Sequence, residues 1–97
     1  MKLTKIKLTK KQYINSYLRN FEDGDINYLG LCLVSEIEER NSEIENEDDK
    51  EFVLELVENA IAIMNSAKRR KLFKAAINEK TAQYCKTLKK FKKTLAA

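Results

Sequence analysis

The stretch FVLELVENAIAIM, residues 52–64, decides the fold of this 97-residue chain. Written as a helix, it places apolar side chains over more than half of its circumference. Its one polar stripe consists of Glu51, Glu55 and Glu58. A helix this apolar is either the centre of a fold or one half of an interface. We expect a helix over about residues 49–65, and we favour a place at the centre of the fold.

The rest of the chain also favours helices. Pro is absent, and Gly occurs only at positions 24 and 30, so the turns that hairpins need are missing. Apolar spacing predicts a first helix over about residues 10–21. A second helix follows FEDGD, is capped by Asp25 and ends between residues 40 and 45. Gly30 lies on its apolar face, where it would let a neighbouring helix come close.

The final segment predicts a long helix. Its apolar residues recur at steps of three, four and seven, which is the spacing of a coiled-coil seam. An unbroken helix over residues 67–95 would be about 43 Å long, more than the other helices can cover. Either its last turns project, or a second copy covers them in a homodimer, or the chain kinks near residues 78–81. The seam residues are Phe73, Ile77, Tyr84, Leu88, Phe91 and Leu95.

These patterns predict an all-α fold, a small four-helix domain with a long basic C-terminal helix. Ninety-seven residues make a single domain, residues 1–97. Residues 1–8 are short, basic and partly alternating, and we expect a short N-terminal arm there.

The chemistry of catalysis is poorly represented. The chain has no histidine, which removes the commonest general base and an important zinc ligand. Cys32 and Cys85 are too few for a structural zinc site or a disulfide framework. We therefore expect no enzymatic activity, no metal, no cofactor and no small-molecule substrate.

The expected location is cytoplasmic. No apolar h-region follows the N-terminal lysines, as a secretory signal would require. The longest apolar run, residues 28–34, is far shorter than a membrane span. We expect no membrane partner. The abundance of Lys, Ile, Asn and Glu suggests an AT-rich genome.

Charge is segregated along the chain, although the net charge is only +4. Residues 36–51 are strongly acidic, and residues 68–97 are strongly basic. Surface pairs between the two could neutralise part of this charge, but each would contribute little. On a continuous last helix, one broad side would be basic along its length. The residues expected to bind a partner are Lys68, Arg69, Arg70, Lys71, Lys74, Lys86, Lys89, Lys92 and Lys93.

The cluster KRRK, residues 68–71, is a special case. We expect it near the start of the last helix, where positive charge is unfavourable. If this helix is nearly continuous with the one before it, the objection weakens. Otherwise the cluster calls for an external reason.

Non-enzymatic binding to an acidic partner is the expected function, and a nucleic acid or a nucleoprotein fits best. A first alternative is an inhibitor of a host protein, such as a nucleic-acid-binding defence complex, acting through the acidic segment 36–51. Small helical inhibitors from phages and other mobile elements fit that description. A second alternative is a self-assembling structural subunit. The acidic residues of the inhibitor alternative are Glu43, Glu45, Glu47 and Asp48.

Overall fold

The computed structural model describes residues 10–21 and 25–97 and contains helices without any strand in these ranges. The all-α prediction is therefore confirmed. The predicted arm over residues 1–8 lies outside the described residues. The helices are α1 (Lys10–Arg19), α2 (Ile26–Ser42), α3 (Glu47–Arg69), α4 (Lys71–Lys74) and α5 (Glu79–Ala96).

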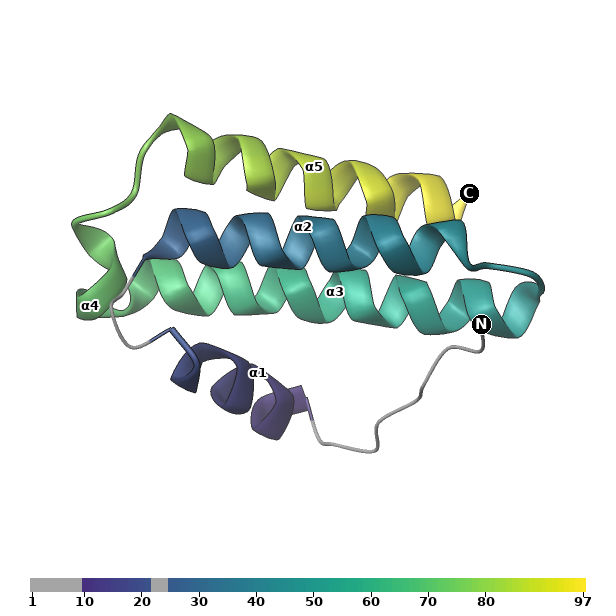
Figure 1. Cartoon of the computed structure of the whole chain (residues 1–97), viewed down its shortest axis with the longest axis horizontal. Helices are drawn as coiled ribbons and strands as arrows, with labels where there is room; N and C mark the ends of the chain where they lie inside the picture. The colour runs from purple at the N-terminus through teal and green to yellow at the C-terminus, as the bar shows by residue number, and fades with distance from the viewer. Residues whose placement is uncertain (1–9, 22–24) are drawn as a thin grey trace.

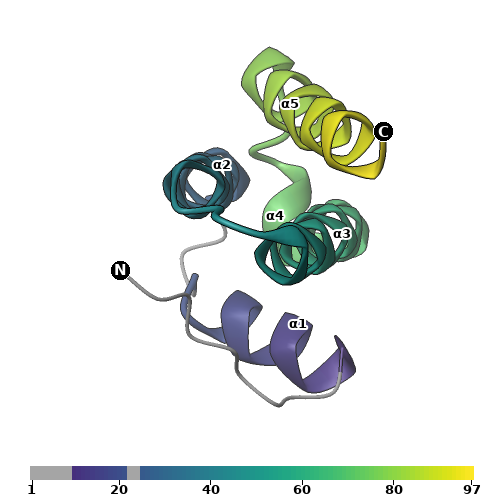
Figure 2. The same cartoon turned by 90° about the vertical axis from the view of Figure 1, so that its right-hand side faces the viewer.

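Helix α3 is the central element. Figure 1 shows α2, α3 and α5 side by side, with α3 running opposite to the other two, and Figure 2 shows α1 crossing beneath them. Helix α3 packs against α1, α2, α4 and α5. Its side chains Val53, Val57 and Ile63 are fully buried. The prediction that this apolar helix is the centre of the fold, rather than half of an interface, is confirmed.

Helix α2 begins at the predicted cap. The Asp25 carboxylate accepts hydrogen bonds from the backbone N–H groups of Asn27 and Tyr28, at 3.1 and 3.0 Å. These bonds satisfy two of the N–H groups that every helix start leaves without an intrahelical partner. The helix ends at Ser42, inside the predicted window.

Gly30 brings α2 and α5 close together. A Cβ atom at this position would lie 2.6 Å from Cδ2 of Tyr84, which is closer than packed carbon atoms approach. Only a glycine leaves room for this tyrosine ring, so the predicted close approach of a neighbouring helix is confirmed.

Helix α3 is longer than predicted. Asn46 caps its start, where the Asn46 side chain accepts a hydrogen bond of 2.9 Å from the backbone N–H of Asp49. The helix then continues through Asn65 and Ser66, which we expected to end it, and stops at Arg69. Polar residues are weak helix breakers, and the burial of Ala67 beyond them favours the helical conformation.

Of the alternatives for residues 67–95, the unbroken helix is wrong, and a break close to the predicted kink at residues 78–81 is confirmed. Arg70 has an extended backbone, with φ −78° and ψ 133°, and separates α3 from the single turn of α4. Phe73 anchors that turn, because only 1% of its surface is exposed. Helix α5 then starts afresh at Asn78, whose side chain accepts a hydrogen bond from the backbone N–H of Lys80 at 2.9 Å.

The connection between α4 and α5 is tied to α2. The hydroxyl group of Thr81 donates to Oδ1 of Asn27 at 2.7 Å, and Nδ2 of Asn27 donates to the backbone oxygen of Ala76 at 3.1 Å. The Thr81 hydroxyl also accepts from the backbone N–H of Asn78 at 3.1 Å, which completes a capping box. This network turns the chain back so that α5 lies along α2 and α3.

Because the α4–α5 connection folds α5 back onto its own domain, the apolar seam does not need a second copy of the chain to cover it. Of the predicted seam residues, Leu88 and Leu95 are buried within their own domain, at 0% and 8% exposure. Ile77 is not on a helix at all, and 43% of its surface is exposed. The last turns of α5 therefore neither project nor need a second copy to cover them.

Candidate functional site

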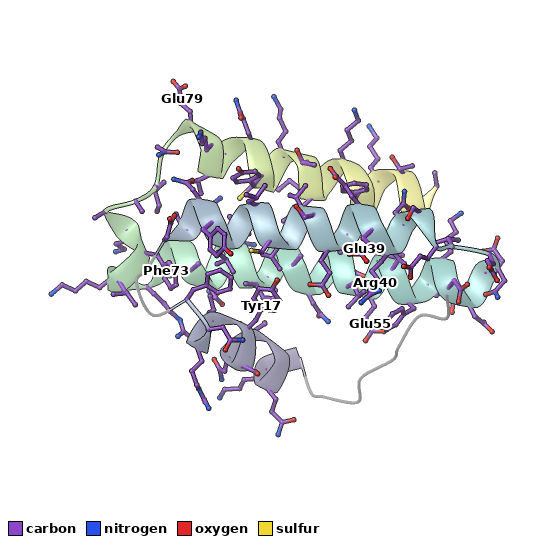
Figure 3. All side chains as sticks on the ribbon, viewed as in Figure 1. Tyr17, Glu39, Arg40, Glu55, Phe73 and Glu79 are labelled. Carbon is purple, nitrogen blue, oxygen red and sulfur yellow. The ribbon has the colours of Figure 1, made fainter. Side chains whose placement is uncertain are left out.

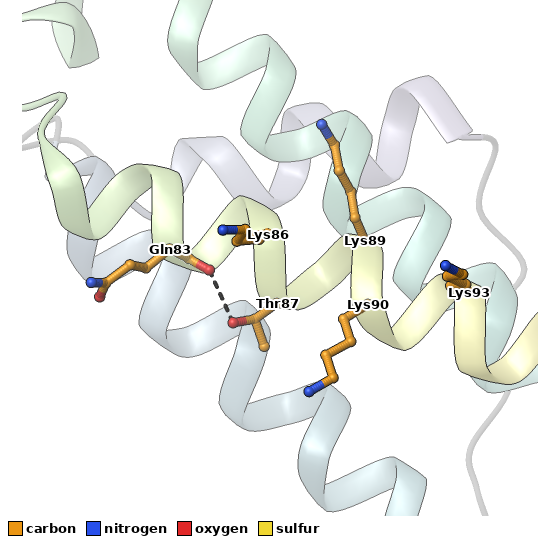
Figure 4. Close-up of a pocket in the computed structure, with 6 residues that line it drawn as sticks. All are labelled: Gln83, Lys86, Thr87, Lys89, Lys90 and Lys93. Atoms are coloured by element: carbon orange, nitrogen blue, oxygen red, sulfur yellow. Dashed lines mark hydrogen bonds between the residues drawn. The ribbon is translucent and has the colours of Figure 1, made fainter.

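Helix α5 has one buried side and one basic side. It contains six lysines and a single acidic residue, Glu79. Glu79 lies in the first turn and points away from the bundle (Figure 3). Four of the lysines line one shallow depression on the outer surface of α5 (Figure 4). We call these four residues the lysine stripe: Lys86, Lys89, Lys90 and Lys93.

The lysine stripe lacks compensating charge. All four side chains are exposed, and none of them makes an ion pair or a side-chain hydrogen bond with the described residues. Their spacing also places like charges three and four residues apart on one helix surface. Each such pair destabilises a helix by about 0.2–0.5 kcal/mol. The fold therefore carries an unfavourable local charge that an anionic partner would relieve.

Lys92 does not belong to this stripe, although the sequence analysis grouped it with Lys86, Lys89 and Lys93. Its ammonium group lies 3.9 Å from the Glu58 carboxylate of α3, and both side chains are about half exposed. Among the described residues it is the one ion pair between α5 and another helix, and an exposed pair contributes little. Mutual neutralisation of the basic and acidic regions is thus slight.

Lys90 is the stripe residue that the sequence analysis missed. The binding residues predicted from the sequence include Lys86, Lys89 and Lys93 but leave out Lys90. A wheel centred on Leu88, the buried anchor of α5, places Lys90 beside Lys86 and opposite the core. The available signal was the Asn-x-x-Thr capping sequence at residues 78–81, which marks where the helix begins.

The remaining predicted binding residues lie at one end of the bundle, which we call the basic end: Lys68, Arg69, Arg70, Lys71 and Lys74. The structure does not join them to the lysine stripe in one continuous face. Lys68 and Arg69 occupy the last turn of α3, where positive charge complements the helix dipole. The expectation that they sit at a helix N-terminus is wrong, because the helix before them is longer than predicted.

The basic end also contains a hydrogen bond to α1 and two exposed apolar side chains. The Arg70 guanidinium donates a hydrogen bond of 3.1 Å to Oδ1 of Asn15 and so links this end to α1. The aliphatic side chains of Leu72 and Ile77 are exposed near the same cations. Part of this charge therefore has a structural role inside the domain.

The acidic residues of the inhibitor alternative surround the connection between α2 and α3, at the end of the bundle opposite α4 (Figure 1). Glu47 and Asp48 stand in the first turn of α3, where negative charge is favourable. Glu43 is paired with Arg40 at 3.5 Å. Glu45 is exposed. The favourable position of acidic side chains at the start of α3 is therefore a structural reason for most of the negative charge in this connection.

Other chemistry is sparse in the described part of the chain. No group of three or more Cys, Asp or Glu side chains is arranged to hold a metal ion among residues 10–21 and 25–97. Cys32 and Cys85 are free thiols, and both pack partly buried against the core. In the same ranges, no helix has the length and apolar character needed to cross a membrane.

Comparison with models of known protein families, with curated proteins and with solved structures gives no match for this chain. The case for a function therefore depends on the charges and geometry described above.

Proposed function

We propose that this protein is a non-enzymatic nucleic-acid-binding protein that contacts the phosphate backbone through the lysine stripe of α5. The observation that carries the proposal is the set of four exposed lysines that make no ion pair with any residue of the described ranges 10–21 and 25–97. Lysine contacts to phosphates release condensed counterions and supply affinity that does not depend on base sequence. A net charge of +4 further favours association with a polyanion.

The stripe is better suited to backbone contact than to base reading. Helix α5 contains no arginine, and arginine is the side chain that most often reads guanine through two hydrogen bonds. Lysine acts as a compact point charge on a flexible stem. We therefore expect weak sequence preference.

The test compares two variants with the same change in charge. The first replaces the lysine stripe by Gln, and the second replaces four exposed cations near the α4 end by Gln: Arg69, Lys71, Lys74 and Lys80. Fluorescence anisotropy with labelled DNA of two unrelated sequences, at two salt concentrations, measures binding. We expect the stripe variant to lose at least tenfold in affinity for both sequences, and the control variant to lose less than threefold.

Two outcomes would overturn the proposal. Absence of binding by the unaltered protein at low salt removes nucleic acid as a partner. An equal loss in both variants means that only net charge matters and that the stripe is no site. If instead a pull-down finds a protein partner that is lost when Glu45, Glu47 and Asp48 are neutralised, the inhibitor alternative is supported.

A further inference from the structure

The four lysines of the stripe are spread across α5 as well as along it. Lys86 and Lys93 are seven residues apart, which is about 10 Å along the helix axis. Between them, Lys89 and Lys90 extend to opposite sides of the helix (Figure 4). Successive helical residues differ by about 100° in direction, which explains this divergence. The stripe therefore presents charge on two flanks with two further charges in the middle.

This width matches a double-stranded ligand. An α-helix with its side chains is about 10–12 Å across, and the major groove of B-form DNA is about 12 Å wide. Helix α5 has 18 residues, or about 27 Å, and stands at one corner of the bundle with its outer side free (Figure 2). Lys89 and Lys90 would then reach the phosphates of the two strands that border the groove.

The aromatic side chains of α5 do not suit a single strand. Single-stranded nucleic acids are commonly held by bases stacked on exposed aromatic rings. Tyr84 and Phe91 are both partly buried, and Tyr84 packs over Gly30 of α2. Phe91 lies in a groove between α5 and α2 that Asn41 and the stripe residue Lys90 also line, and its ring packs partly buried against the core. Both rings are therefore partly occupied by packing inside the bundle, and neither is a fully exposed platform for stacked bases.

We infer that the partner of the lysine stripe is double-stranded B-form DNA, with α5 lying in the major groove and its lysines contacting the phosphates of both strands. This inference rests on the proposed function and gives its ligand class. An A-form RNA duplex is excluded by shape, because its major groove is too narrow and deep for a helix to enter.

The first experiment compares ligands. Anisotropy titrations use a 20-base-pair DNA duplex, its single strand and an RNA duplex of the same sequence, all at 50 mM salt. We expect at least tenfold tighter binding to the DNA duplex than to either of the others. Four neutralised phosphates predict a salt slope of about −3.6, so affinity for the DNA duplex should fall about 150-fold between 50 and 200 mM salt.

The second experiment tests the two flanks and the groove. Replacing Lys89 and Lys90 by Gln should reduce the salt slope on duplex DNA by about two. Replacing Lys71 and Lys74 by Gln, a matched change of charge at the basic end, should leave the slope nearly unchanged. A major-groove ligand such as methyl green should compete with the protein, whereas the minor-groove ligand netropsin should not.

The outcomes separate this inference from the proposed function. Equal affinity for the single strand or for the RNA duplex, or competition by netropsin alone, overturns the inference and leaves backbone binding in place. Failure to bind any of the three ligands at 50 mM salt overturns both. Circular dichroism of each variant confirms that helicity is retained, which is expected because Gln and Lys have similar helix propensity.

Discussion

The basic end and the lysine stripe have similar charge but different physical situations. At the basic end, Lys68 and Arg69 complete a helix C-terminus, and Arg70 is hydrogen-bonded to α1. In the stripe, only Lys93 stands in the last turn of its helix, and the other three lysines repel each other without an ion pair to any residue that the structure describes. Positive charge alone is therefore a poor indicator of a binding surface, and the absence of a structural reason for that charge is a better one.

The largest expected effect is a loss of stability that leaves the affinity for DNA nearly unchanged. Replacing Phe73 by Ala should cost about 3–5 kcal/mol in the free energy of unfolding, because this buried ring anchors α4. Denaturant titration measures the cost. Affinity for DNA, measured below the unfolding transition, should change less than twofold, because the stripe lies on another helix. Phe73→Leu provides a milder variant, and loss of binding in that variant would show that the basic end takes part.

The second expected effect concerns how α5 is seated. Gly30→Ala would press a methyl group into Tyr84, and overpacking of this kind costs about 1–3 kcal/mol. Tyr84→Ala removes the ring atoms at 2.6 and 2.9 Å but keeps Cβ of residue 84 at 3.0 Å, so in that background Gly30→Ala should cost less than it does beside the tyrosine ring. Thermal unfolding of the four proteins in this cycle measures the coupling. Equal effects of Gly30→Ala in both backgrounds would contradict the close packing of α2 and α5.

The third expected effect is that removing lysines from the stripe makes the protein more stable. Replacing Lys86, Lys89 and Lys90 by Gln removes five like-charge pairs at spacings of three and four residues, four within the stripe and one with Lys92, while Lys93 stays in the last turn. We expect the free energy of unfolding to rise by about 1 kcal/mol at low salt. At 1 M salt the gain should nearly disappear, because exposed charges are screened. A loss of stability in low salt would mean that the stripe has a structural role.

The smallest expected effect is a loss of stability, opposite in sign to the gain expected when lysines of the stripe are replaced. Replacing Lys68 and Arg69 by Gln removes cations from the last turn of α3, and each change should lower stability by about 0.3–1 kcal/mol. Chemical denaturation at low salt measures this loss of stability, and the stripe variant is measured in parallel for comparison. If both sets of variants gain stability, the two basic regions do not differ in the way proposed here.

Much of the fold could be predicted from local patterns. Apolar periodicity predicted the helices, and Asp25 predicted the start of α2. The apolar stretch at residues 52–64 predicted the central helix. These features depend on residues close together in the sequence, so the signal survives without knowledge of the fold. The candidate site was predicted only in part: Lys86, Lys89 and Lys93 were identified, Lys90 was not, and Lys92 and the basic end were wrongly placed on the same face.

The sequence by itself determined that the chain is helical and that Gly30 allows a close approach, and it favoured a central place for α3. It placed Leu88 and Leu95 on one apolar seam but left open what covers them. Only the tertiary structure decided where the last helix begins. No Pro or Gly interrupts residues 67–95, and the apolar spacing continues across the break, so local propensity favours an unbroken helix. Burial of Phe73 and the hydrogen bonds from Asn27 to the α4–α5 connection stabilise the turn instead. Because these contacts join residues about fifty positions apart, they arise only when the chain has folded, and they place the basic end and the lysine stripe on separate surfaces.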